Sequence, residues 1–284
     1  MSGRRVNLQK GFVDEAVAAA SAREKMVLEA LSLLIPYDLE GERKKRFGAL
    51  GTGAYAWGDG TYVLVDRCRP PQDIVSFGVG PIVSFELEMA ERGHRVFLFD
   101  HTVQGLPAHH ERFTWFREGV CAESQPQPGL STLASIVSRL PTSADAPILK
   151  MDIEGAEWAI FAEMPVELLC RFEQIALEVH HLDRLEDPQF NALARRALDK
   201  LAQHFTLCHV HANNYGFVHN LAGTLPVAET LELTYLRSDL ARPLPSKTLY
   251  PTIIDFANYR TLTEIRLWFY PFMPGSEHFR ADAA

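Results

Sequence analysis

The sequence predicts an α/β fold, in which a mostly parallel sheet has helices on both faces. Apolar runs of strand length alternate with runs of helical periodicity, the pattern of parallel strands joined by crossover helices. The clearest unit extends from Asp73 to Asp100: an apolar strand, a glycine turn, a helix start and a second strand that ends in an acid. The late strand at 231–237 follows a loop with no room for a helix, so we expect it to be antiparallel.

The alternation continues along most of the chain. Strands are expected at 74–77, 96–99, 113–116, 147–151, 174–179, 206–212 and 231–237, which makes a seven-stranded sheet. Helices are expected between them at 84–92, 131–140, 156–170 and 188–204. The predicted architecture is therefore Rossmann-like, and ligands of such sheets bind at the carboxyl ends of the strands.

The remaining residues form an appendage at each end. Residues 12–35 have the apolar periodicity of an amphipathic helix that Pro36 ends, and we expect this helix to pack on the core. The basic run Gly41-Glu-Arg-Lys-Lys-Arg46 is interpreted as a solvated face rather than a binding patch. Asp59-Gly60 is typical of a hairpin turn before a strand at 61–65. The predicted organisation is a helical extension at 1–45, a Rossmann-like domain at 46–270 and a tail at 271–284.

Composition excludes several classes of partner. The net charge of −8 argues against broad nucleic-acid binding, which depends on clustered Lys and Arg. No apolar run approaches the roughly 20 residues that span a bilayer, and the first residues lack the apolar core of a signal peptide, so no membrane association is expected. The four cysteines are scattered and indicate neither a zinc site nor a disulfide framework. We expect a cytoplasmic protein, and a homodimer stays open.

The glycine turn after the first strand predicts a nucleoside site. Gly78 and Gly80 allow a tight turn that approaches a ligand closely. Asp100 lies 22 residues beyond Gly78, where an acid can bind ribose hydroxyls. The dinucleotide motif requires a third glycine at the position of Val83, so a pyrophosphate is poorly accommodated. S-adenosylmethionine has the adenosine without the phosphate and fits better than NAD.

A second motif, Ile148-Leu-Lys-Met-Asp-Ile-Glu-Gly-Ala-Glu-Trp158, brings acids to the same sheet edge. A buried strand delivers Asp152 to its carboxyl end, and Gly155 permits a sharp turn. Glu154 and Glu157 then lie near a helix N-terminus, where a capping role alone would explain them. Asp152 is less easily explained in that way, because three acids within six residues repel one another without a cation or ligand.

The next strand ends in Glu178, His180 and His181. Glu178 and His180 alternate and share one face of the strand. If this strand neighbours the one that ends at Asp152, oxygen and nitrogen donors suited to Mg²⁺, Mn²⁺ or another divalent metal meet at one edge. The same groups could instead supply a general base, since histidine titrates near neutral pH. Hydrogen-bonded core or rim histidines are the third possibility.

A third strand also ends in polar groups. His209 and His211 share a face, which brings imidazole to the same edge once more, whereas Asn213 and Asn214 suit a tight turn. The turn explains the asparagines without any function. It does not explain the histidines.

Together these motifs resemble the FkbM-like family of S-adenosylmethionine-dependent methyltransferases, in the branch with a Ser-Phe-Gly-x-Gly motif. The resemblance extends over about residues 43–256 and rests on five segments in order: 75–86, 99–100, 149–157, 178–180 and 211–216, with the late 231–235. It implies the class I methyltransferase fold and S-adenosylmethionine as cofactor. The cofactor-binding residues that it implies are Ser76, Phe77, Gly78, Gly80, Ser84, Glu86, Asp100 and Asp152.

The resemblance also implies O-methylation of a small-molecule acceptor, a hydroxyl of a sugar or natural product. Such an enzyme must align the acceptor oxygen with the methyl group and remove a proton. Asp152, Glu178 and His180 could hold a metal that lowers the acceptor's pKa, or His180 or His181, with Asp152, could act without a metal. A non-catalytic S-adenosylmethionine-binding module and an NAD(P)-dependent oxidoreductase are the alternative classes.

Overall fold

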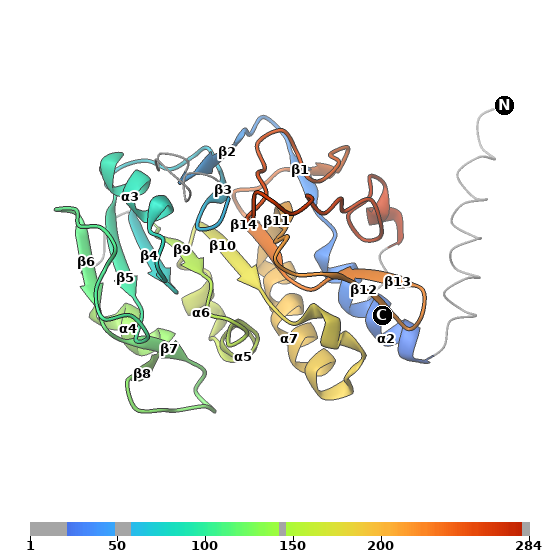
Figure 1. Ribbon diagram of the computed structural model, residues 1–284, viewed down its shortest axis with the longest axis horizontal. Coiled ribbons are helices and arrows are strands. Elements are labelled where there is room, and N and C mark those ends of the chain that lie inside the picture. Colours follow the sequence, from blue (N-terminus) through green and yellow to red (C-terminus); the bar gives the residue numbers. More distant parts are fainter. Residues whose placement is uncertain (1–21, 49–57, 142–145, 280–284) are drawn as a thin grey trace.

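The computed structural model describes residues 22–48, 58–141 and 146–279. Its centre is a seven-stranded sheet in the order β6-β5-β4-β9-β10-β14-β11 (Figure 1). The strands are β4 Asp73–Phe77, β5 Arg95–Phe99, β6 Phe113–Phe116, β9 Ile148–Met151, β10 Gln174–Val179, β11 Phe205–Ala212 and β14 Leu231–Arg237. Strand β14 is antiparallel to both its neighbours, β10 and β11, and the pairs from β10 to β6 are parallel. The predicted Rossmann-like, class I methyltransferase fold is confirmed.

Helices cover both faces of this sheet, because the alternating side chains of the strands make two cores. Val75 and Phe77 of β4 belong to the larger core, with α4 Leu133–Arg139, α5 Glu157–Glu163 and α7 Pro188–His204. Ile74 faces the smaller core beneath α3 Ser84–Glu91. Figure 1 shows α4 to α7 together below the sheet and α3 above it. Asp187 caps the N-terminus of α7 by accepting a hydrogen bond from the Gln189 amide at 2.9 Å.

One predicted helix is divided. The segment expected as a single helix at 156–170 forms α5 and then α6 Val166–Leu169, separated at Pro165. Met164 precedes this proline and has extended backbone angles, φ −54° and ψ 130°, because proline disfavours the helical conformation in the residue before it.

The N-terminal helix is present where the structure describes it. Residues 12–21 of the predicted helix lie outside the described residues; α2 Ala22–Leu31 continues as a 3₁₀ turn, η1 Ser32–Leu34. Asn191 of α7, which is buried, donates hydrogen bonds to the carbonyl oxygens of Met26 at 3.1 Å and Leu185 at 2.9 Å. The described part of this helix therefore packs on the core. No helix in the described part of the chain combines the length and apolarity needed to cross a bilayer.

The basic run at 41–46 corrects the expectation of a solvated face. Its second half forms β2 Lys44–Phe47, which pairs antiparallel with β3 Tyr62–Val65, and the Arg46 residue is only 7% exposed. The predicted boundary after residue 45 falls inside β2. Preceding β2, β1 Tyr37–Leu39 pairs antiparallel with β15 Pro243–Pro245 in a separate two-stranded sheet, which joins an early segment of the chain to a late one.

Two small strand pairs and two 3₁₀ turns complete the described fold. Strands β7 Gly119–Cys121 and β8 Leu130–Thr132 pair in parallel, and β12 Val218–Leu221 forms a hairpin with β13 Leu225–Ala228. The 3₁₀ turn η2 Leu182–Glu186 follows β10. The turn η3 Ser276–Phe279 is the last element of the described chain.

Candidate active site

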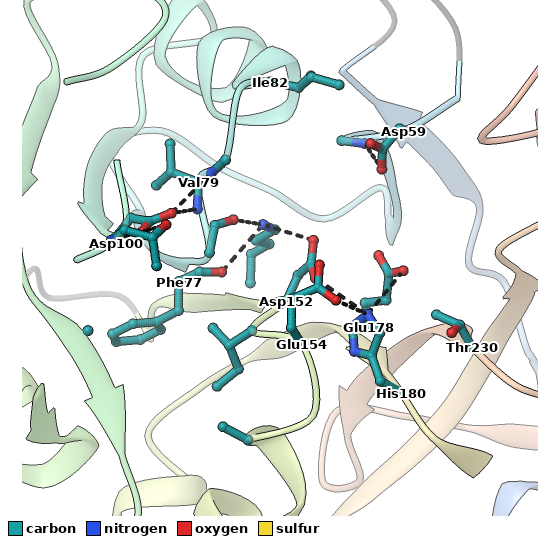
Figure 2. Close-up of a pocket in the computed structure, with 18 of the residues that line it drawn as sticks. Asp59, Phe77, Val79, Ile82, Asp100, Asp152, Glu154, Glu178, His180 and Thr230 are labelled. Carbon is teal, nitrogen blue, oxygen red and sulfur yellow. Dashed lines mark hydrogen bonds and ion pairs between the residues drawn. The ribbon is translucent and has the colours of Figure 1, made fainter. Parts of the chain in front are cut away.

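A cavity of about 690 Å³ opens at the carboxyl ends of the parallel strands (Figure 2). Its wall comes from the loops after β5, β4, β9 and β10, together with residues 213–216 after β11 and 229–230 before β14. Because this order follows the strand order of the sheet, the glycine turn lies at one end of the cavity and the β11 loop at the other. The acids of β9 and β10 lie between them.

The glycine turn is held against the end of β9. Gly78 has φ +75°, and a Cβ atom on it would lie 1.5 Å from the carbonyl oxygen of Asp152. Gly80 has φ +57°, and a Cβ atom on it would have no other atom within 4 Å. The Asp152 amide also donates a hydrogen bond to the Phe77 carbonyl at 3.1 Å. Glycine is therefore required at position 78 for packing and backbone conformation together.

Asp100 supports the glycine turn from β5. One carboxylate oxygen accepts hydrogen bonds from the amides of Val79 at 3.0 Å and Gly80 at 3.1 Å. The other accepts from the amide and the hydroxyl of Thr102 at 2.7 and 2.6 Å. Burial raises the pKa of Asp100, but these hydrogen bonds outweigh burial and the net pKa is lowered. A charged carboxylate thus lies in the cavity wall where the sequence places the ribose-binding acid.

The cofactor-binding residues implied by the resemblance fall into two groups. Five line the cavity: Phe77, Gly78, Gly80, Asp100 and Asp152. Three do not, namely Ser76, Ser84 and Glu86. The Ser76 hydroxyl donates to the buried Glu86 carboxylate at 2.6 Å, and the Ser84 hydroxyl donates to the Gly60 carbonyl at 3.0 Å. These three side chains therefore make contacts within the protein, which join α3 to β4 and to the turn at Gly60.

Asp152, Glu178 and His180 converge as their strands predict. Met151 of β9 is the register partner of Leu177 of β10, so Asp152 and Glu178 follow side by side. The potential ligand atoms of Asp152, Glu178 and His180 all lie within 4.8 Å of one another. This set of two carboxylates and one imidazole is a plausible donor set for a divalent metal.

Glu157 orients the His180 ring. Its Oε1 atom lies 2.9 Å from Nδ1 of His180 and also accepts the His180 amide at 2.9 Å. Protonated Nδ1 leaves Nε2 of the ring directed at Glu178 Oε1, 3.7 Å away, and Asp152 Oδ1, 4.0 Å away. Burial lowers the pKa of His180, but the hydrogen bond to Glu157 and the nearby carboxylates outweigh it and raise the pKa to about 9. A carboxylate that orients a histidine in this way is the usual partner of a metal-binding imidazole.

The two carboxylates have different surroundings. Glu178 is buried and accepts a hydrogen bond from Asn213 Nδ2 at 2.8 Å. Burial, followed by the charges of Asp152 and Glu232, raises its pKa well above the usual value. Asp152 accepts a hydrogen bond from the Tyr62 hydroxyl at 3.0 Å, and the Lys150 ammonium lies 3.7 Å from the same oxygen. A cation beside these carboxylates would relieve their repulsion.

Sequence reasoning missed three residues of this wall, Lys150, Asp59 and Asn213, and also Tyr62, which donates a hydrogen bond to Asp152. Lys150 alternates with Asp152 along β9, which was a usable signal, and its ammonium also donates to the carbonyl oxygens of Phe77, at 3.4 Å, and Gly78. Asp59, Tyr62 and Asn213 come from distant segments and gave no local signal. Burial, then the charge of Asp152, raises the pKa of Asp59, and this acid lines the cavity within the predicted turn. His181 lies exposed in the cavity wall at φ +66°.

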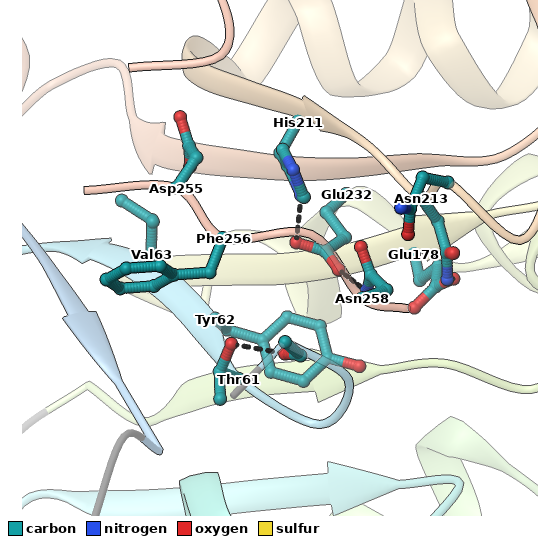
Figure 3. Close-up of polar contacts among 12 residues, drawn as sticks. Thr61, Tyr62, Val63, Glu178, His211, Asn213, Glu232, Asp255, Phe256 and Asn258 are labelled. Atoms are coloured by element: carbon teal, nitrogen blue, oxygen red, sulfur yellow. Dashed lines mark hydrogen bonds and ion pairs between the residues drawn. The ribbon is translucent and has the colours of Figure 1, made fainter. Parts of the chain in front are cut away.

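The histidines of β11 do not reach the cavity, which corrects the expectation that a third strand brings imidazole to its edge. His209 Nε2 lies 2.8 Å from Asp255, and His211 lies 3.0 Å from Glu232 and 2.7 Å from Glu264. The contacts with Asp255 and Glu264 attach the C-terminal segment, residues 255–264, to the sheet. Figure 3 shows the contact between His211 and Glu232, with Asn258 on the other side of Glu232. In the same cluster, Asn258 donates to Glu232 at 2.6 Å, and Arg46 lies 3.9 Å from Asp255.

The comparisons with known proteins give weak likenesses. No family model matches the chain and no curated protein matches it, so membership of the FkbM-like family stays a prediction. Matching solved structures include the fibrillarin/Nop5p complex, with a TM-score of 0.36, 9% identity and coverage of 60% of this chain and 74% of that chain. A putative S-adenosylmethionine-dependent methyltransferase from Listeria monocytogenes has a TM-score of 0.34, 9% identity and coverage of 59% and 90%. A TehB-like S-adenosylmethionine-dependent methyltransferase from Corynebacterium glutamicum has a TM-score of 0.31 and 10% identity, and the match covers 60% of this chain and 82% of that chain. Likenesses this weak say nothing about the chemistry of the cavity.

The contact at Gly78 predicts a large effect of one methyl group. Gly78→Ala should destabilise the protein by several kcal/mol, because its Cβ would overlap the Asp152 carbonyl and the φ angle is strained. Gly80→Ala, with open space around it, should lose only about 1–2 kcal/mol from its left-handed conformation. Urea unfolding of both variants measures the difference, and equal free energies of unfolding would contradict the close approach.

The His211 contacts predict a pH-dependent stability. Burial lowers the pKa of His211, but Glu232, Glu264 and Asp255 outweigh burial and raise it to about 10. The folded state therefore holds a proton that the unfolded chain releases near pH 6.5, and this stabilisation is lost as the pH rises toward 10. The stability advantage of the wild type over His211→Gln should shrink by about 1.4 kcal/mol per pH unit within that window. The advantage over His109→Gln, an exposed control, should stay flat; a flat His211 curve would contradict the ion-pair assignment.

Proposed function

We propose that this chain is an S-adenosylmethionine-dependent O-methyltransferase that acts on a hydroxyl of a small metabolite or sugar. One observation carries the proposal: within a single cavity, the glycine turn with its charged Asp100 lies directly beside the cluster of Asp152, Glu178 and His180. The first group suits an adenosine without phosphates, and the second suits the activation of a hydroxyl next to it.

The donor end of the cavity fits S-adenosylmethionine in shape and charge. Phe77 and Phe99 form part of an apolar wall, with ring centroids 5.0 Å apart. Asp100 is charged, and its two oxygens already accept four hydrogen bonds, so a ribose hydroxyl would bind this carboxylate in place of the Thr102 hydroxyl. The carboxylates in the wall also favour the positive sulfonium. S-adenosylmethionine would supply a methyl group that is already activated for transfer.

The acid cluster would hold a divalent metal through Asp152, Glu178 and His180. Three features support this: the ligand atoms lie within 4.8 Å of one another, Glu157 orients the imidazole, and burial together with the charges of Asp152 and Glu232 raises the pKa of Glu178. When bound, such a metal lowers the pKa of the acceptor hydroxyl.

The other side chains of the cavity would position and deprotonate the acceptor. Tyr62 and Lys150 fix the Asp152 carboxylate, and Asn213 fixes Glu178. His181 is exposed in the wall and would take the acceptor proton if His180 binds the metal. In a reaction without metal, His180 itself would be the base, and its pKa of about 9 would place that activity at alkaline pH, where the ring is neutral.

The cofactor assignment predicts the effect of Asp100→Asn. Loss of the charge should weaken S-adenosylhomocysteine binding about ten- to hundredfold, since hydrogen bonds to a charged group contribute about 1.5–3 kcal/mol each. Isothermal titration calorimetry measures the affinity. Glu111→Gln, which removes an acid with an 81% exposed side chain outside the cavity wall, is the matched control and should bind as the wild type does. Undiminished affinity in Asp100→Asn would exclude the assignment.

The metal assignment predicts a separation of chemistry from cofactor binding. Asp152→Asn and Glu178→Gln should each abolish Mn²⁺ binding by the protein alone and lower turnover far more than S-adenosylmethionine affinity. Glu229→Gln, another acid of the wall that lies outside the ligand cluster, should retain Mn²⁺. EDTA should inactivate the wild type. If EDTA has no effect and His180→Ala costs about 10²–10⁴-fold in turnover, the reaction uses a base without metal.

A further inference from the structure

The cavity end farthest from the glycine turn is aromatic. Tyr215 follows β11, lines the cavity and is 56% exposed. Its ring packs against that of Tyr259, from the C-terminal segment, with centroids 4.9 Å apart and an interplanar angle of 41°. Tyr259 is 43% exposed. Tyr215 therefore presents a half-exposed ring in the cavity wall, and Tyr259 packs against this ring from outside the lining. The two rings together form an apolar surface with polar edges, which suits a ring-shaped ligand.

Two buried asparagines fix this tyrosine pair. Asn214 accepts the Tyr259 amide at 2.7 Å and donates to the Tyr259 carbonyl at 3.0 Å. Asn213 accepts the Tyr215 amide at 2.9 Å, while its side-chain nitrogen donates to Glu178 at 2.8 Å. One side chain therefore sets the position of Tyr215 relative to the carboxylate of the acid cluster. A tight turn needs only hydrogen bonds within its own backbone, whereas these two asparagines also hold Glu178 and Tyr259 in place.

The charge of the wall restricts what can bind there. Among the described residues that line the cavity, Lys150 is the one lysine or arginine, and its ammonium is directed at the Gly78 carbonyl and Asp152. The acids of the wall are Asp59, Asp100, Asp152, Glu154, Glu178 and Glu229. The two cationic groups of the wall are already engaged, Lys150 with Asp152 and the Gly78 carbonyl and His180 with Glu157, so a phosphate or carboxylate on the acceptor would meet a net negative field.

We propose that Tyr215 and Tyr259 form the acceptor subsite and that the acceptor is an uncharged ring, a sugar or a phenol, that lacks phosphate and carboxylate groups. The sheet edge places the donor end, the acid cluster and the tyrosine pair in that order. A ring stacked on Tyr215 directs a hydroxyl toward Glu178 and Asp152, with the donor methyl beyond it. This subsite rests on the proposed function, because it takes the glycine turn as the donor end.

Matched probes test the subsite. The full chain, saturated with S-adenosylhomocysteine, is titrated with two ring pairs: methyl glucoside against glucose 6-phosphate, and 4-hydroxybenzyl alcohol against 4-hydroxybenzoate. Saturation-transfer NMR follows binding. At least one neutral probe should bind at least tenfold more tightly than its anionic counterpart, and the pair that binds tells a sugar from a phenol. Binding that is equal for neutral and anionic members, or absent for both neutral probes, overturns the proposal.

Variants of the tyrosine test the stacking. Tyr215→Ala should weaken the neutral probe about three- to tenfold, as expected for the loss of one ring contact, and Tyr215→Phe should retain binding. Phe217→Ala is the control: Phe217 is 70% exposed, two residues along, and outside the cavity wall. Unchanged binding in Tyr215→Ala, or equal losses in Tyr215→Ala and Phe217→Ala, refutes the subsite.

Calorimetry with S-adenosylhomocysteine separates this proposal from the previous one. Tyr215→Ala should bind S-adenosylhomocysteine as the wild type does. A wild type that binds the neutral ring but no S-adenosylhomocysteine would retain the ring subsite and refute the methyltransferase. A wild type that binds S-adenosylhomocysteine but no neutral ring would refute the ring subsite and leave the methyltransferase proposal standing.

Discussion

The close approach of β4 to β9 is the constraint on which the cavity depends. The turn at Gly78 lies so near the Asp152 carbonyl that no side chain fits between them. Lys150 reinforces this contact by donating to carbonyl oxygens of the turn, and Asp100 supports the turn from its other side. The donor end and the acid cluster are therefore parts of one rigid wall rather than two separate loops, and a ligand in the first lies next to the second.

The electrostatics of the wall explain its supporting residues. Burial, and then the neighbouring charges of Asp152 and Glu232, raises the pKa of Glu178 at this sheet edge. The protein limits this repulsion with a hydrogen-bond donor or cation beside each acid: Tyr62 and Lys150 for Asp152, Asn213 for Glu178, and His211 for Glu232. Glu157 interacts instead with the His180 ring. The remaining negative charge favours cations, which agrees with a sulfonium donor and a divalent metal.

The C-terminal segment completes the site through a buried polar cluster. Asp255 contacts His209 and Arg46, and Asn258 contacts Glu232. Tyr259 follows directly and meets Tyr215 at the cavity mouth. Breaking a buried ion pair leaves an uncompensated charge, so each contact here fixes the position of the segment. Arg46 and Tyr259, which lie far apart in the sequence, thus belong to one structural unit.

The sequence by itself determined the sheet. Hydrophobic periodicity and the absence of a helix before 231–237 predicted the strands and the direction of the last one, because these features depend on local composition. It also placed Asp152, Glu178 and His180 together, since parallel neighbouring strands end at the same edge. Tertiary structure alone decided the rest. Arg46 and the β11 histidines are polar residues that the sequence pattern assigned to solvent or the cavity. Their partners are Asp255, Glu232 and Glu264, which come from elsewhere in the chain. Pairings between distant segments leave no periodic signal, so neither the attachment of the C-terminal segment nor the tyrosine pair could be predicted.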